Sequence, residues 1–167
     1  MLSSSMGKSR FKAPIHALLV VFYRRIDFAC LEYRNGRKQL SLYCRNLPKD
    51  NSKTRLFRMA LAHFETCIVH ANAAIICLVA INSGLQQKNQ QKPNDEYDRL
   101  RKISNRIRHY DEDVFANGNF KKQFHISPVW LTDKEIVTRQ CSLTFVELRQ
   151  LLIVAMNDAK AFAEMLR

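Results

Sequence analysis

The stretch that decides the fold is Ile68–Ile81, IVHANAAIICLVAI. On a helix this sequence places apolar or small side chains on nearly every side, and a helix that is apolar all round must be enclosed by other elements. The pattern extends back to about residue 53, after the capping residue Ser52, and forward to the NSG sequence at 82–84, which suits a helix C-terminus. The sequence therefore predicts a long central helix in a helical bundle.

A membrane span is the alternative interpretation of residues 67–85, because the stretch is almost long enough to cross a bilayer. It contains His70, Asn72 and Asn82, and an arginine-rich turn precedes it. Polar side chains are costly in lipid, so a buried core helix is preferred. The apolar run at 17–22 is too short for a secretory signal. We expect a cytoplasmic protein that does not associate with membranes, and a membrane-associated helical protein is the weaker alternative.

The composition favours one helical domain. A chain of 167 residues is long enough for a sizeable core, and four glycines and four prolines are few for a loop-rich β fold. The five cysteines are odd in number and lack CxxC spacing, so we expect buried thiols in a reducing compartment and no metal site. The chain has no glycine-rich phosphate loop, and we expect no cofactor.

Residues 1–12 are predicted to be a disordered basic arm, and residues 13–167 a single helical domain. Helical spacing of apolar positions runs from Ala13 to about Tyr33, and Asn35-Gly36 is a typical helix end. A rival interpretation pairs ACLEY with KQLSLYC across RNGR as a β-hairpin, since Asn-Gly is also a strong turn signal. The helix is preferred to about Tyr33, and the conformation of 37–46 stays open.

The second half of the chain predicts two more helices around an insertion. A polar connector at 85–94 leads to a basic helix at about 95–110. The conformation of 119–141 stays open. One interpretation is that QFHISPVWL and EIVTRQCSL form a short hairpin around residues 132–134, with Pro128 restricting the first strand to an edge. Thr144 and Glu147 form a capping box that opens the last helix. The prediction is an all-α, antiparallel four-helix bundle with a short β-hairpin before the last helix.

Positive charge is concentrated in two segments. Residues 1–60 hold 13 Lys and Arg against 3 acids, and residues 99–110 hold five cations and no acid. The net charge of +12 exceeds what solubility alone requires, so a polyanion such as RNA is the favoured partner. A solvated charged surface is the simpler alternative.

The second of these segments lies within RKISNRIRHYDEDV, residues 101–114. Apolar positions 100, 103, 107, 110 and 114 share one helix face, so Asn105 and His109 lie on the other, one turn apart. A histidine exchanges protons near neutral pH, and flanking cations suit it to a phosphodiester. The simpler alternative is an ordinary surface histidine on a charged helix face, with no catalytic role. Residues 55 and 58 add arginines on the long helix, and the candidate nucleic-acid contacts are Arg55, Arg58, Arg106, Arg108 and Tyr110.

With these residues in view, the chain resembles the HEPN superfamily, small helical bundles that include ribonucleases, toxins and phage-defence proteins. The resemblance is carried by the bundle order, the long central helix and Asn105-x3-His109 followed by an aromatic residue and acids. It implies a metal-independent endoribonuclease in which His109 assists the 2′-hydroxyl attack and a nearby arginine stabilises the phosphorane. It also implies a homodimer that brings two histidines to one cleft, with an antitoxin or defence-complex subunit as a protein partner. Residues 68–81 are apolar on nearly every side of the helix, which is compatible with that dimer.

One position departs from the family pattern. Ser104 stands where active members place arginine, and a hydroxyl cannot replace a guanidinium. Lys102 falls within the family's looser spacing and Arg101 lies one position beyond it, so the candidate catalytic set is His109, Asn105, Arg101, Lys102 and Ser104. Three hypotheses therefore remain: a ribonuclease, a catalytically silent RNA-binding protein, and an interaction subunit of a larger complex. For other side chains we expect structural roles, with His63 and His70 bonded to neighbours and Trp130 anchoring a loop.

Overall fold

The computed structural model describes residues 13–45, 51–84, 95–110 and 128–165. These ranges contain four helices, α1 (Ala13–Arg45), α2 (Asn51–Gly84), α3 (Asp95–Arg108) and α5 (Phe145–Met165). Three short strands, β1 (Trp130–Leu131), β2 (Glu135–Val137) and β3 (Ser142–Thr144), precede α5. The predicted all-α fold with a short β insertion before the last helix is confirmed. The predicted arm at 1–12, the loop at 46–50 and the connector at 85–94 lie outside the described residues.

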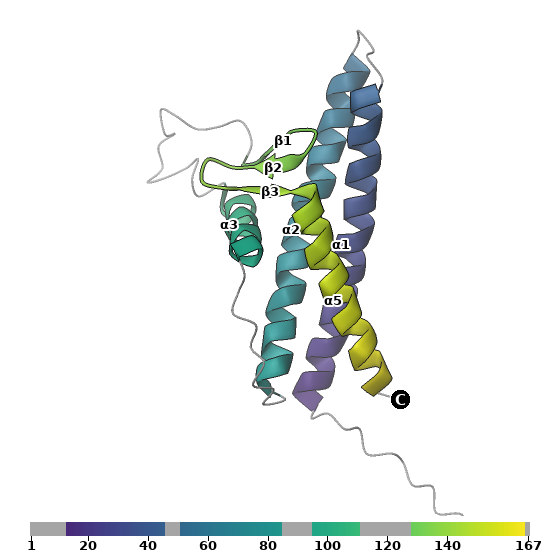
Figure 1. The fold of residues 1–167 in the computed structure, drawn as a ribbon, viewed down its shortest axis with the longest axis vertical. Helices are drawn as coiled ribbons and strands as arrows, with labels where there is room; N and C mark the ends of the chain where they lie inside the picture. The colour runs from purple at the N-terminus through teal and green to yellow at the C-terminus, as the bar shows by residue number, and fades with distance from the viewer. Residues whose placement is uncertain (1–12, 46–50, 85–94, 111–127, 166–167) are drawn as a thin grey trace, which may run out of the picture.

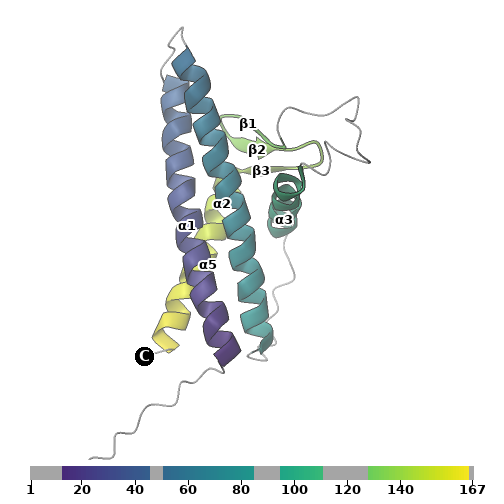
Figure 2. The same cartoon turned by 180° about the vertical axis from the view of Figure 1, so that it is seen from behind.

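Two long antiparallel helices, α1 and α2, form the framework (Figure 1). They contain 33 and 34 residues, which at 1.5 Å per residue gives each a length of about 50 Å. α5 crosses one face of this pair obliquely, and α3 lies beside the middle of α2 (Figure 1). The opposite face of the pair carries no other described element (Figure 2). The bundle is therefore layered on one side only of the α1–α2 pair.

α1 continues through Asn35-Gly36 to Arg45, so the predicted helix end and the rival hairpin are both wrong. Gly36 is buried, and a Cβ atom on it would lie 3.0 Å from the ring of Phe64 on α2. Phe64 is itself fully buried, stacked 4.7 Å from Phe145 and edge-on to Tyr33. The missing side chain lets α1 and α2 approach closely here. The glycine is a packing residue and does not end the helix.

α2 spans the predicted long helix, beginning at Asn51 and ending at Gly84. One side of it is fully buried, but Ile76 and Val79 each expose 50% of their surface. By length and composition, residues 53–84 would suffice to cross a membrane, and 44% of the apolar window is buried in the structure. The core helix of a soluble protein passes the same test. α2 is central to the fold, yet part of its apolar surface is left uncovered by described residues.

α5 is tied to α1 at two points by tyrosine hydroxyls. Tyr23 donates to the carbonyl of Ala159 at 2.6 Å, and Tyr33 donates to the carbonyl of Phe145 at 3.0 Å. α5 buries a stripe of apolar residues along one side. The buried residues of this stripe are Leu148, Leu152, Ala155, Ala159 and Phe162.

The predicted capping box at the start of α5 is confirmed. The backbone N–H of Thr144 donates to Glu147 Oε2 at 2.8 Å, and the N–H of Glu147 donates to Thr144 Oγ1 at 3.1 Å. Arg99 of α3 donates to both carboxylate oxygens of Glu147, at 2.8 and 3.2 Å, and to the carbonyl of Ser142 at 2.8 Å. One arginine therefore joins α3 to β3 and to the first turn of α5.

The β insertion is an antiparallel sheet in the order β1-β2-β3. The predicted turn at 132–134 joins β1 to β2, with β1 at the edge. EIVTRQCSL does not form one strand, because Thr138 begins a second turn in which its hydroxyl accepts from the N–H of Cys141 at 3.1 Å. β3 therefore pairs with β2, and Ile136 pairs with Leu143 in the buried layer of the sheet.

Candidate nucleic-acid interface

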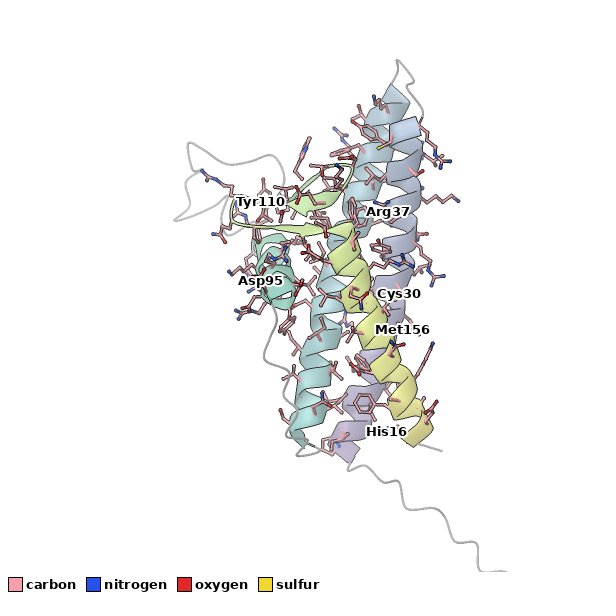
Figure 3. The ribbon with its side chains drawn as sticks, viewed as in Figure 1. His16, Cys30, Arg37, Asp95, Tyr110 and Met156 are labelled. Carbon is pink, nitrogen blue, oxygen red and sulfur yellow. The ribbon has the colours of Figure 1, made fainter. Side chains whose placement is uncertain are left out.

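α3 has the two faces that its sequence predicts. Leu100, Ile103 and Ser104 are buried, and Ile107 packs against the core. The other face is exposed to solvent, and Asp95 and Tyr110 lie at the two ends of the segment (Figure 3). Besides the acid Asp95, the exposed side chains are Arg101, Lys102, Asn105, Arg108 and His109. The imidazole therefore lies on the solvent side of α3, among cations.

Asn105 and Arg108 form a fixed pair on this face. Arg108 donates to Asn105 Oδ1 at 2.8 Å, while the backbone carbonyl of Asn105 accepts from the N–H of His109 at 3.0 Å. The side-chain amide of Asn105 thus binds the guanidinium of the residue that precedes the histidine. Such an arrangement presents a planar cation and a proton-exchanging group to an anion on the same side of the helix.

The position that resembles the family's arginine site faces the interior. Ser104 is fully buried, and its hydroxyl has no hydrogen-bond partner among the described residues. A side chain at this position packs between elements, so the Ser104 hydroxyl has no access to a ligand on the solvent face. The structure thus separates Ser104 from the other four candidate catalytic residues.

Arg101 and Lys102 lie on the exposed face, but far along the helix from His109. Seven or eight residues at 1.5 Å each separate the Cα atoms by about 10 to 12 Å. Arg101 also contacts Asp98, with 3.3 Å between guanidinium and carboxylate. Arg108, by contrast, is hydrogen-bonded to Asn105.

The two remaining cations of 99–110, Arg106 and Arg99, have different surroundings. The Arg106 guanidinium lies 5.8 Å from the ring centroid of the half-buried Tyr110. Arg99, the fifth cation of 99–110, is occupied by Glu147, Ser142 and Asp95. It contributes to the attachment of α3 and is not an open phosphate contact. The acids at 111–113 lie outside the described residues.

Arg55 and Arg58 are exposed on α2, in a second basic region that we call the hairpin tip, formed by residues 34–45 and 51–62. The three-stranded sheet lies between this tip and α3 (Figures 1 and 2). A depression of about 460 Å³ on α2 is lined by Thr54, Arg55, Arg58, Met59 and Ala62. In its described residues the tip contains no acid, and its cations are Arg34, Arg37, Lys38, Arg45, Lys53, Arg55 and Arg58.

Aromatic side chains at the hairpin tip form a row that the sequence pattern did not reveal. Tyr43, Phe57 and Trp130 come from α1, α2 and β1, with centroid distances of 5.4 Å and then 4.9 Å. The Lys53 ammonium lies 5.2 Å from the Tyr43 ring centroid. A separate cation–ring contact joins the tip to the start of α5: the guanidinium of Arg37 on α1 (Figure 3) lies 4.7 Å from the Phe145 ring centroid.

The two histidines of α2 are bonded to α1, as predicted. His63 Nδ1 lies 2.7 Å from a Glu32 carboxylate oxygen, and Arg25 lies 3.0 Å from His70 Nδ1. Burial, with Arg25 nearby, lowers the pKa of His70, and its ring stacks 5.4 Å from Phe28. Among the described residues, no group of three or more His, Cys, Asp or Glu side chains is arranged to hold a metal ion.

Comparison of the chain with protein-family models, curated proteins and solved structures gives no match. The resemblance to the HEPN superfamily therefore rests on the sequence features alone.

Proposed function

We propose that this protein binds RNA through the exposed cationic face of α3 and the hairpin tip, and that it cleaves RNA slowly or not at all. The observation that carries the proposal is the division of α3 into a sealed apolar face and an outer face of cations around His109. Two basic surfaces on one domain are the electrostatic footprint of a polyanion-binding protein. The resemblance to the HEPN superfamily, with its degenerate motif, points to the same class of ligand.

Slow cleavage is expected because a proton-transfer group alone supplies only part of the catalysis. His109 is exposed and suited to acid–base chemistry, but the buried Ser104 provides no charge for the phosphorane. Loss of one such stabilising group costs on the order of 100-fold or more in rate. Arg108, the residue before His109, is a cation that donates a hydrogen bond to Asn105. Residual activity would therefore depend on His109 and Arg108.

Cleavage is tested by incubating total RNA in EDTA with the wild-type protein and with His109→Ala. Equal RNA integrity in both samples is the expected result. Rapid loss of RNA with the wild type that is abolished in His109→Ala would contradict a catalytically silent RNA-binding protein. It would support an endoribonuclease.

Binding is tested by fluorescence anisotropy of a labelled single-stranded RNA at several salt concentrations. We expect affinity to fall steeply with salt, and each phosphate contact removed to lower the slope by about 0.7. Lys102→Glu with Arg108→Glu should weaken binding, whereas Lys160→Glu, an exposed lysine near the end of α5, should leave it unchanged. Salt-independent or absent binding would overturn the proposal.

A second candidate is a helical interaction subunit, including the homodimer that the resemblance implies. The observation that favours it is that several large apolar side chains of α1 and α2 are exposed to solvent. Each exposes between 41% and 50% of its surface, and they are Val21, Phe28, Leu31, Ile76 and Val79. Apolar surface of this extent typically marks an interaction site.

This candidate is tested by light scattering coupled to size-exclusion chromatography. A dimer that Phe28→Asp dissociates and Val146→Asp does not would support it, because Val146 is an exposed apolar residue on α5. A monomer at all concentrations would exclude the homodimer. An antitoxin or defence-complex partner stays a prediction of the resemblance.

A further inference from the structure

Trp130 is more exposed than a structural anchor needs to be. It is the only tryptophan of the chain, and it leaves 59% of its surface accessible. Its ring contacts Phe57, so it does attach β1 to α2, as an anchor would. β1 is an edge strand, however, and no further strand covers it in the described sheet. One part of the indole is therefore supported by protein while another part faces solvent.

The ring row behind Trp130 gives that exposed surface a rigid support. Phe57 and Tyr43 are both half-buried. The ring centroid of Phe57 lies 4.9 Å from that of Trp130, and the centroid of Tyr43 lies 5.4 Å from that of Phe57. Side chains from three separate segments fix the row, so the indole is held in place before any ligand arrives. Such preorganisation lowers the entropic cost of binding.

Cations of the hairpin tip lie beside the Tyr43 end of the row. Lys53 lies over the Tyr43 ring, and Arg58 follows Phe57 by one residue on α2. The described residues of the hairpin tip contain seven cations and no acid. An aromatic ring exposed within a cationic surface is the combination that single-stranded nucleic acids recognise, since the bases stack and the phosphates meet the charges.

We propose that Trp130 is a base-stacking platform on which one unpaired base of a single-stranded RNA docks. The Phe57–Tyr43 row supports the indole from within, and Lys53, at the other end of the row, would contact a backbone phosphate further along the strand. This inference rests on the proposed function, because it names a contact by which RNA is held. It adds to that function a requirement for bases, which charge alone does not impose.

The single tryptophan makes the test direct. The full chain is titrated with oligouridine and with an abasic oligonucleotide of equal length, and tryptophan fluorescence is recorded. Oligouridine should quench the emission, while the abasic strand should bind without doing so. Quenching of equal depth by both strands, or by neither, overturns the stacking site even where binding is observed. Absence of any binding would overturn the proposed function as well.

Affinity measurements with a labelled strand provide the second arm. Trp130→Ala should weaken oligouridine binding by about 5- to 100-fold, as expected for loss of one base–aromatic stack, and leave abasic-strand binding unchanged. Trp130→Tyr should recover most of the loss, and Val146→Ala is the matched control for an exposed apolar residue. Equal losses for both strands would mean that Trp130 only supports the fold. Where Trp130→Ala does not fold, the wild-type quenching and Trp130→Tyr decide the question.

Discussion

Glu147→Gln tests how the helices are joined, because this carboxylate serves two elements at once. It accepts two hydrogen bonds from Arg99 of α3 and closes the capping box with Thr144. Glutamine retains the shape and an acceptor for the capping box, so the substitution isolates the charge. We expect a folded protein with a weaker attachment of α3.

The magnitude follows from the pKa of Glu147, which is lowered from 4.5 to about 2. The hydrogen bond from Arg99 is the main cause, with bonds from Thr144 adding to it against the opposing effect of burial. A difference of this size corresponds to about 3 kcal/mol by linkage. The two side chains remain 20% and 28% exposed, so solvent screening reduces the expected loss to about 1–2 kcal/mol.

The pH dependence has a definite sign. Because the pKa of Glu147 is lower in the folded state, its contribution is fully present above about pH 4.5. It is lost as the pH falls from there toward 2. The free energies of unfolding of wild type and Glu147→Gln should therefore differ near neutral pH and converge in acid.

The assay is urea denaturation followed by circular dichroism at about pH 7 and about pH 3. Glu164→Gln, an exposed carboxylate on the same helix, is the control and should match the wild type at both. Equal stability of Glu147→Gln and the control at neutral pH would refute the reasoning. A deficit that is undiminished in acid would refute the assignment of the effect to the charge.

Three further substitutions test the packing of the bundle. Gly36→Val should destabilise by about 2 kcal/mol, because its side chain would overlap the ring of Phe64; an unchanged thermal midpoint would show that α1 and α2 separate easily. Ser104→Ala should leave the free energy of unfolding unchanged or raise it by up to about 1 kcal/mol, since a buried unpaired hydroxyl is removed; a clear loss in urea denaturation would reveal a partner for that hydroxyl. Tyr23→Phe should lower the free energy of unfolding by about 1 kcal/mol in the same assay, because the hydrogen bond to the Ala159 carbonyl is lost. Tyr43→Phe is the control, since the structure records no hydrogen bond for the Tyr43 hydroxyl.

Periodicity predicted the helices well because each has one side that must be buried. The capping box of Thr144 and Glu147 was equally readable, since both partners lie within four residues of each other. Asn35-Gly36 misled because a local turn signal was outweighed by a tertiary contact. Nothing near Gly36 in the sequence announces that Phe64 will lie against it. The second turn, at Thr138, was missed because a short apolar run does not reveal where it bends.

The candidate site was predictable in part for the same reason. Helical spacing placed Asn105 and His109 on the solvent face of α3, where the structure has them. The role of Arg99 was not readable, because its partner Glu147 lies 48 residues further along the chain. The row at the hairpin tip joins three segments, so no local pattern contains it. Contacts of this kind depend on how the elements pack, which the periodicity of each element does not specify.

The long α1–α2 pair has a consequence for the order in which the chain folds. Residues on either side of the 46–50 connection are near in sequence, so their contacts close small loops and carry a low entropic cost. The hydrogen bond from Tyr23 to Ala159 instead joins residues 136 positions apart. We therefore expect the two long helices to associate early and the last helix to dock onto a preformed surface, so that substitutions at Tyr23 accelerate unfolding more than they slow refolding.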